Sequence, residues 1–157
     1  AQNRGIVFMS TPFDLESLKF IDKLVSIHKI SSSDITNVPL IRAVAETRKP
    51  VLLSTGASTL GEIKFAIEIL ESSGASEVVP MHCVLNYPTP TSQAHLSMIA
   101  SLKTEFPNKI IGYSDHVKPT KDMLCLISAY LCGSRVFEKH FTDDKSRPGN
   151  DHYHSMD

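Results

Sequence analysis

Gly112-Tyr113-Ser114-Asp115-His116 is the stretch that decides the fold, because a strand-like run ends there in three polar side chains. A second stretch, Glu138-Lys139-His140-Phe141-Thr142, repeats this pattern after another strand-like run. In an α/β barrel, polar and functional side chains collect where the strands leave the core. The two stretches therefore predict that their histidines lie at the mouth of a barrel, on the rim of one divalent-metal site.

Short apolar or β-branched runs alternate with amphipathic helical patterns along the whole chain. Strand candidates recur every ~20–30 residues, which is typical of βα units that carry a parallel sheet. Between them, residues 15–24 and 63–70 place apolar side chains three and four positions apart, as expected of helices packed on a sheet. The strand candidates are 6–10, 27–31, 50–54, 78–83, 109–114 and 134–140.

Several helix ends are also marked in the sequence. Thr59-Leu60-Gly61-Glu62 has the form of a capping box, and Asn37 precedes a helix with Pro39 in its first turn. Gly74 and Gly133 stand where the C-terminal caps of two helices belong. The sequence has no low-complexity tract, charge block or linker, so we predict a single domain that covers the whole chain.

The number of strand candidates is too small for a complete eight-stranded barrel, which takes about 250 residues. An open α/β sheet is the alternative, but it concentrates its site at a switch point between only a few strands. Here every strand candidate ends in polar residues. We therefore predict an incomplete TIM-type (β/α) barrel of about six βα units.

Composition excludes several functional classes. With 157 residues, 41% apolar residues, 21% charged residues and a formal charge of −1, the chain resembles an ordinary soluble globular protein. Lys and Arg form no basic stripe, so we expect neither nucleic acid nor a membrane as partner. Residues 1–20 lack the pattern of a signal peptide, so we expect a cytoplasmic location. The three cysteines have no CxxC spacing, which argues against disulfides and structural zinc.

Seven stretches, in order and over nearly the whole chain, resemble the N-acetylneuraminate (sialic acid) synthase family and its relatives that make other nonulosonic acids. The resemblance implies a barrel of which this chain supplies strands 3–8. It also implies that the first two strands, and the C-terminal antifreeze-like domain of many members, are absent here, and that the full-length protein is a homodimer. The stretches are Phe8–Phe13, His28–Asp34, Leu53–Gly56, His82–Cys83 with Tyr87–Pro88, Gly112–His116, Glu138–Thr142, and Arg147–Gly149 with Asp151–His152.

The resemblance implies a metal-dependent transferase. It condenses phosphoenolpyruvate with an N-acyl mannosamine-type sugar, opened to its aldehyde, to give a nonulosonic acid and phosphate. His116 and His140 match the metal ligands of the family, and Asp151 matches a catalytic position that orients a ligand or carries a proton. Two imidazoles completed by water and substrate oxygens suit Mn²⁺, with Mg²⁺ or Co²⁺ as alternatives.

The resemblance also implies substrate-binding positions. Phosphoenolpyruvate is a compact trianion whose site needs cations and hydrogen-bond donors. Lys29 is the natural counter-charge because it interrupts an apolar run, whereas Ser54 is equally compatible with a turn that starts a helix. The positions for phosphoenolpyruvate are Thr11, Lys29, Ser32, Ser54 and Ser114, and those for the amino sugar are Asp34, Tyr87 and Asp151.

One departure from the family pattern keeps two alternatives open. Leu85 stands where the family commonly has Asn or Ser directed at phosphoenolpyruvate, and leucine cannot make that hydrogen bond. The alternatives are a truncated or degenerate barrel that binds metal and anions without turnover, and another phosphoenolpyruvate-dependent 3-deoxy sugar-acid synthase. Of the other histidines, we expect His82 to be buried on its strand, His152 to neighbour the site, and His154 to be structural or solvated.

Overall fold

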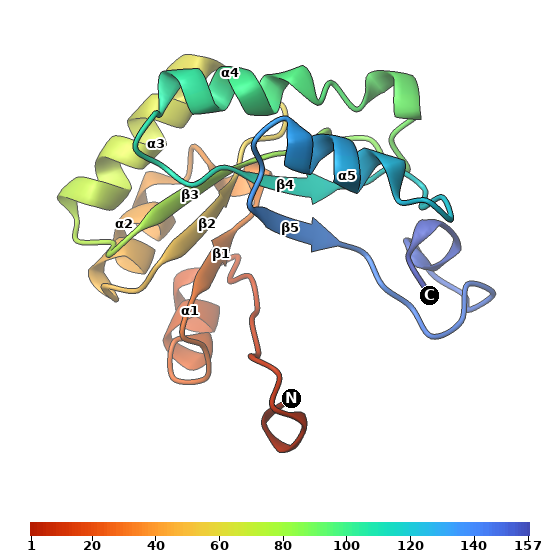
Figure 1. The fold of residues 1–157 in the computed structure, drawn as a ribbon. Helices are drawn as coiled ribbons and strands as arrows, with labels where there is room; N and C mark the ends of the chain where they lie inside the picture. The colour runs from red at the N-terminus through yellow and green to blue at the C-terminus, as the bar shows by residue number, and fades with distance from the viewer. The chain divides into compact units, whose positions relative to one another are not determined.

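A computed structural model describes residues 1–157, apart from the side chain of Gln2. The chain folds as two compact units, residues 1–80 and 81–157, and each combines parallel strands with helices (Figure 1). The α/β class predicted from the sequence is confirmed by this alternation, whereas the single domain stays a prediction. No helix among the described residues is long and apolar enough to cross a membrane.

The first unit contains two complete strands and the start of a third. In it, β1 (His28–Ile30) pairs with β2 (Val51–Ser54) in parallel, with Lys29 opposite Leu52. The strand β3 (Val78–His82) begins in this unit and ends in the second. The helices are α1 (Leu15–Ile21), α2 (Val38–Glu46) and α3 (Leu60–Ser72), with 3₁₀ turns at Gln2–Arg4 and Ser32–Asp34.

The helix ends of the first unit follow the sequence signals. The Asn37 side chain accepts a hydrogen bond from the Leu40 backbone N–H at the start of α2. At the start of α3, Thr59 and Glu62 form both hydrogen bonds of a capping box. Gly74 ends the same helix at φ 109°, where a side chain would be strained. These predicted caps are confirmed.

The second unit contains the end of β3, then β4 (Gly112–Asp115) and β5 (Val136–Lys139), again paired in parallel. The pairing places Ser114 opposite Glu138 and Asp115 opposite Lys139. Its helices are α4 (Ser97–Glu105) and α5 (Leu124–Leu131), with 3₁₀ turns η3 (Thr91–Gln93) and η4 (His152–His154). In the strand order, β1 and β2 are followed by the start of β3 within the first unit, and the end of β3 is followed by β4 and β5 within the second.

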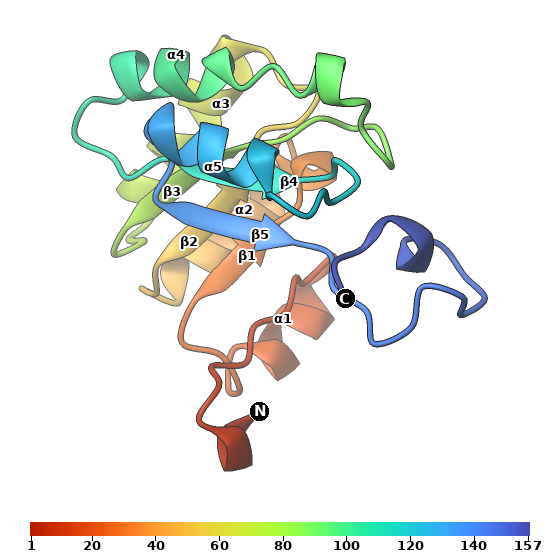
Figure 2. The same cartoon turned by 45° about the vertical axis from the view of Figure 1, so that its right-hand side comes forward.

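The C-terminal segment after β5 curls back on itself and carries η4, as the blue ribbon in Figure 2 shows. The backbone N–H of Thr142 donates to the carbonyl of Met156 at 2.7 Å, and the N–H of Met156 donates to the carbonyl of His140 at 2.8 Å. These two bonds close a loop over residues 142–156. Residues that are distant in sequence from β5 are thereby held next to its end.

The strand predicted at residues 6–10 is absent from the sheet that the structure describes, which contains five strands. The count of six βα units is therefore not confirmed. Ile6 and Val7 are 65% and 66% exposed, and the N–H of Ile6 bonds to the carbonyl of Ala1 in a local turn. An apolar run becomes a strand through pairing and burial, and in this structure these side chains gain no burial.

Candidate metal centre

A buried ion pair fixes the ends of β4 and β5. One carboxylate oxygen of Asp115 lies 3.0 Å from Lys139 Nζ, and these side chains are only 3% and 9% exposed. The other oxygen accepts hydrogen bonds from the Tyr113 hydroxyl and the Val117 N–H, each at 2.9 Å. Burial and the nearby Asp115 raise the pKa of Tyr113 far above its usual value, so its phenol stays protonated and donates.

One residue beyond this ion pair, the hydrogen bonds around His116 select a single tautomer. Its Nδ1 lies 2.6 Å from the Val84 carbonyl, which can only accept, so Nδ1 carries the proton and Nε2 carries a lone pair. Burial lowers the pKa of His116 and favours the neutral ring. Ser114 Oγ lies 3.3 Å from Nε2 and donates to Glu138 Oε2 at 2.5 Å. A neutral imidazole with an outward lone pair is the form that binds metal ions.

Three further side chains converge near the end of β5. His140 Nδ1 lies 3.7 Å from one oxygen of Asp151, and His154 Nε2 lies 3.7 Å from the other. One ligand atom from each of the three residues lies within 4.8 Å of the others. His140 and Asp151 are partly exposed, whereas His154 is 1% exposed. Two imidazoles and a carboxylate suit a divalent ion, and the three residues form a candidate metal site.

Aromatic contacts connect this cluster to His116. The ring centroids of His116 and His140 lie 5.6 Å apart, and those of His140 and His154 lie 5.3 Å apart. The Tyr87 ring lies 4.1 Å from His116 and 5.9 Å from His140. Within the second unit, the structure therefore brings together Tyr87, Ser114, His116, His140 and Asp151, all of which the sequence analysis singled out.

The first unit holds the other predicted substrate-binding residues. Lys29 lies in β1 and is 8% exposed, Ser32 begins the turn after β1, and Ser54 ends β2 with 3% exposure. Asp34 is half-buried and accepts a hydrogen bond from the Asn37 amide at 3.1 Å, which ties it to the start of α2. Thr11 is half-buried in the segment before α1. Substrate binding by these residues stays a prediction.

His154 was not assigned to the metal site from the sequence, where it is expected to be structural or solvated. The solvated alternative is wrong, because the side chain is buried inside the cluster. The spacing Asp151-x-x-His154 was a usable signal, since residues i and i+3 lie on the same side of a 3₁₀ turn. His152, by contrast, points its Nδ1 at the Thr142 hydroxyl at 2.8 Å. His82 is buried, as expected, and lies 2.8 Å from the Ala94 carbonyl.

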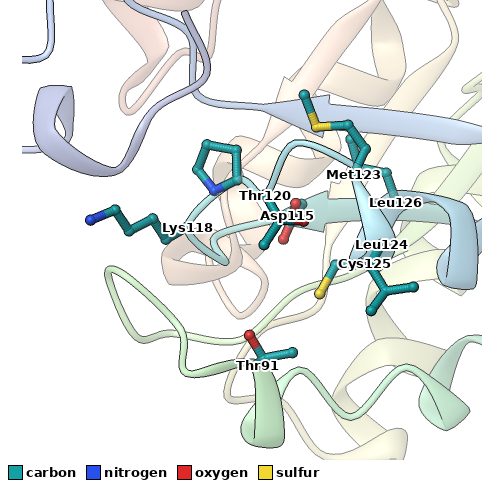
Figure 3. Close-up of a pocket in the computed structure, with 9 residues that line it drawn as sticks. Thr91, Asp115, Lys118, Thr120, Met123, Leu124, Cys125 and Leu126 are labelled. Carbon is teal, nitrogen blue, oxygen red and sulfur yellow. The ribbon is translucent and has the colours of Figure 1, made fainter.

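A small cavity of about 40 Å³ lies beside Asp115, with Thr91 and the start of α5 around it (Figure 3). Cys125 lines this cavity, and burial raises the pKa of its thiol, so the thiolate is disfavoured. Small-molecule sites are usually about 300–1,000 Å³, so this cavity is too small for a sugar or for phosphoenolpyruvate.

The chain resembles one protein family over its whole length, and members of known kinds over most or all of it. The family model described as "NeuB family" matches residues 1–157. The chain is 40% identical to the N,N'-diacetyllegionaminic acid synthase of Campylobacter jejuni, over all of this chain and 47% of that protein. It is 38% identical to the N-acetylneuraminate-9-phosphate synthase of Drosophila melanogaster, over 98% of this chain and 41% of that protein.

The same relationship holds for solved structures. The crystal structure of the spore coat polysaccharide biosynthesis protein SpsE from Bacillus subtilis matches with a TM-score of 0.92 and 33% identity. That match covers 99% of this chain and 43% of the other. The chain thus spans about half the length of the relatives that it matches or less.

Proposed function

Because the chain belongs to the NeuB family, the sialic acid synthase family, we propose that the protein condenses phosphoenolpyruvate with an N-acylated, mannosamine-type sugar. Two relatives are named as synthases of N-acylated nonulosonic acids, which supports an N-acyl sugar as substrate. The observation that carries the proposal is the cluster of His140, Asp151 and His154 beside His116. A family match without such side chains would support the fold but not the chemistry.

The proposed reaction forms one carbon–carbon bond and releases phosphate. The enol carbon of phosphoenolpyruvate attacks the aldehyde carbon of the open-chain sugar, and the aldehyde oxygen becomes a hydroxyl by taking up a proton. Water then adds to the cationic carbon that bears the phosphate, loses a proton to solvent, and phosphate leaves. The products are a nonulosonic acid and inorganic phosphate.

We propose that His116 and His140 bind the divalent metal, with Mn²⁺ as the preferred ion. The bound ion would stabilise the negative charge that develops on the aldehyde oxygen, which is worth several kcal/mol in comparable metalloenzymes. The Val84 carbonyl holds the proton on His116 Nδ1 and so keeps Nε2 available. This arrangement matches the usual support of a ligating histidine by a backbone carbonyl.

Other residues have proposed roles in binding and proton transfer. Lys29 supplies positive charge for phosphoenolpyruvate, together with the hydroxyl groups of Thr11, Ser32, Ser54 and Ser114. Asp34 and Tyr87 bind hydroxyl and N-acyl groups of the sugar. Asp151 either orients the sugar or carries the proton that reaches the aldehyde oxygen. Burial raises the pKa of Tyr87, so its phenol is a hydrogen-bond donor at neutral pH.

The test is phosphate release from phosphoenolpyruvate by the purified protein. We expect release that requires both Mn²⁺ and an N-acyl mannosamine-type sugar, with a sugar phosphate assayed in parallel. His116→Asn and His140→Asn should each lower kcat/KM by about 100-fold or more. His95 provides a matched control because it is exposed and at φ 46°, a backbone conformation that asparagine tolerates.

Three outcomes would contradict parts of the proposed function. Release with a non-acylated sugar phosphate alone would indicate another 3-deoxy sugar-acid synthase and overturn the proposed substrate. Metal binding without turnover on any sugar would support a binding role and overturn the enzymatic proposal. Activity of His116→Asn equal to that of His95→Asn would contradict the metal role of His116. We also propose that the protein is a homodimer, which light scattering measures directly.

A further inference from the structure

The two ring nitrogens of His154 set this side chain apart from most buried histidines. The residue is 1% exposed, and neither Nδ1 nor Nε2 has a hydrogen-bond partner among the described residues. A buried polar atom without a partner costs about 1–3 kcal/mol, so native proteins almost always provide one. His154 therefore occupies a position that a bound group would stabilise.

Two other histidines of the same unit show how a buried imidazole ring is normally anchored. His82 Nε2 lies 2.8 Å from the Ala94 carbonyl, and His116 Nδ1 lies 2.6 Å from the Val84 carbonyl. Each ring is anchored through one nitrogen to a backbone acceptor. His154 lacks such an anchor among the described residues, although it is the most deeply buried of the three. Packing alone does not account for its polar atoms.

The distances from the Asp151 carboxylate to His154 and His140 fit ligands of one ion better than they fit hydrogen bonds. Asp151 lies 3.7 Å from His154 Nε2 and 3.7 Å from His140 Nδ1, which is too long for a hydrogen bond in either case. With metal–ligand bonds of about 2.1 Å, ligand atoms lie ~3.0–4.2 Å apart, depending on the angle between them. The observed separations, all within 4.8 Å, are close to that range.

The local backbone also supports this role. Asp151 adopts a left-handed conformation at φ 74°, which is uncommon for a residue other than glycine. Its carbonyl accepts a hydrogen bond from the Ser155 hydroxyl at 2.7 Å, and the His154 N–H donates to the same carbonyl at 3.3 Å. These bonds turn the chain sharply, so the carboxylate of Asp151 and the ring of His154 lie on the same side of η4.

We propose that His154 is a further protein ligand of the metal that His116 and His140 would hold, and that the Asp151 carboxylate, which lies between the rings of His140 and His154, faces the same ion. The family resemblance assigns only His116 and His140 to the metal, so His154 is an addition. This inference deepens the proposed function and rests on it for the role of the metal. Nitrogen ligands favour Mn²⁺, Co²⁺ and Zn²⁺ over Mg²⁺ and Ca²⁺, so the site should discriminate against the latter two ions.

The test is metal binding by the purified protein, measured by calorimetry with Mn²⁺, Zn²⁺ and Mg²⁺. His154→Phe is the informative variant, because phenylalanine keeps a buried ring and removes both nitrogens. We expect His154→Phe to weaken Mn²⁺ and Zn²⁺ binding by about 100-fold or more, since even residues behind the ligands typically contribute 10–100-fold. Mg²⁺ should bind far more weakly than either ion to the wild-type protein.

His152→Asn is the matched control. His152 lies in the same turn, but its ring faces Thr142 and it is not part of the cluster. This variant should bind Mn²⁺ with an affinity within about threefold of wild type. A His154→Phe protein that binds Mn²⁺ as tightly as the His152→Asn protein would overturn the inference.

A second measurement needs no variant and therefore does not depend on correct folding of His154→Phe. Long-range ¹H–¹⁵N spectra of the wild-type protein report on the ring nitrogens of each histidine, and Zn²⁺ is diamagnetic. We expect one ring nitrogen of His154 to shift strongly when one equivalent of Zn²⁺ is added. Unchanged His154 nitrogens at saturating Zn²⁺ would rule out ligation.

The experiments distinguish failure of the inference about His154 from failure of the proposed enzymatic function. If His154→Phe retains full Mn²⁺ affinity while the wild-type protein releases phosphate in a sugar-dependent manner, the inference fails and the function stands. If the His154 nitrogens respond to Zn²⁺ but no sugar supports phosphate release, the inference stands and the function fails. Calorimetry and spectroscopy therefore test the ligand set independently of turnover.

Discussion

Replacing either partner of the Asp115–Lys139 ion pair should destabilise the protein strongly, whereas replacing both should cost much less. The two side chains are 3% and 9% exposed and lie 3.0 Å apart. Removing one partner of a buried ion pair typically costs about 3–5 kcal/mol, because the other charge is left without compensation. The proposed variants are Asp115→Asn, Lys139→Met and the double variant.

The remaining contacts set the size of each effect. In Asp115→Asn, the amide oxygen still accepts from Tyr113 and Val117, but the amide N–H₂ faces the Lys139 ammonium. The ammonium keeps the carbonyls of Asp115 and Val117 as acceptors, so we expect the low end of the range, about 3 kcal/mol. In Lys139→Met, the carboxylate keeps two donors, and we expect about 2–3 kcal/mol.

The double variant removes both charges and leaves a methionine beside an amide. We expect it to be within about 1–2 kcal/mol of wild type, since neutral replacements of buried ion pairs are often tolerated. The free energies of unfolding come from urea titrations that also report m, which shows whether the unfolding transition is comparable among the variants. The expected coupling energy is at least about 3 kcal/mol.

Additive effects would refute this reasoning. If the double variant loses the sum of the two single losses to within about 0.5 kcal/mol, the two groups do not interact energetically. A loss below about 1 kcal/mol for Asp115→Asn would contradict the claim that this charge is needed to compensate Lys139. Either result would mean that the register of β4 and β5 is held by backbone bonds alone.

Three further predictions concern other parts of the chain. Gly112→Ala should destabilise the protein by about 1–3 kcal/mol, because its Cβ would lie 2.6 Å from Met81 Cγ, whereas Gly61→Ala, whose Cβ would make only an ordinary contact of 3.9 Å with Thr59 Oγ1, should be neutral or stabilising in the same urea titrations. Thr59→Ala removes the capping box of α3 and should cost about 1 kcal/mol, measured by thermal unfolding; an unchanged Tm would contradict it. Burial lowers the pKa of His82 below 6.5, so the unfolded state binds its proton first and the free energy of unfolding should fall as pH drops through 6.5. His82→Gln should flatten that slope in urea titrations at pH 5.5 to 7.5, and an unchanged slope would refute the assignment.

The sequence predicted the elements whose signals are local. Alternating apolar runs and caps such as Thr59 and Asn37 identified strands and helix ends, because propensity and capping depend on residues close in the chain. The same logic failed at residues 6–10. An apolar run there has the composition of a strand, but pairing and burial are decided by distant parts of a protein and cannot be deduced from the run itself.

The candidate metal centre was only partly predictable for the same reason. His116 and His140 could be identified because each directly follows a strand, where parallel strands deliver functional residues. His154 lies in a loop, and its position depends on the hydrogen bonds that join Thr142 and His140 to Met156. Those tertiary contacts have no sequence signature, although the i, i+3 spacing to Asp151 was visible.

The proposed metal role of the neighbouring histidines gives a reason for the burial of Asp115 and Lys139 as a pair. Lys139 directly precedes His140, and an uncompensated ammonium so close to a metal ligand would oppose the binding of a divalent cation. Its pairing with Asp115 cancels that positive charge at a distance of 3.0 Å. Asp151 then adds a carboxylate to the cluster. The ion pair therefore affects the local charge as well as the strand register, because it lets a lysine occupy the end of β5 beside the candidate metal site.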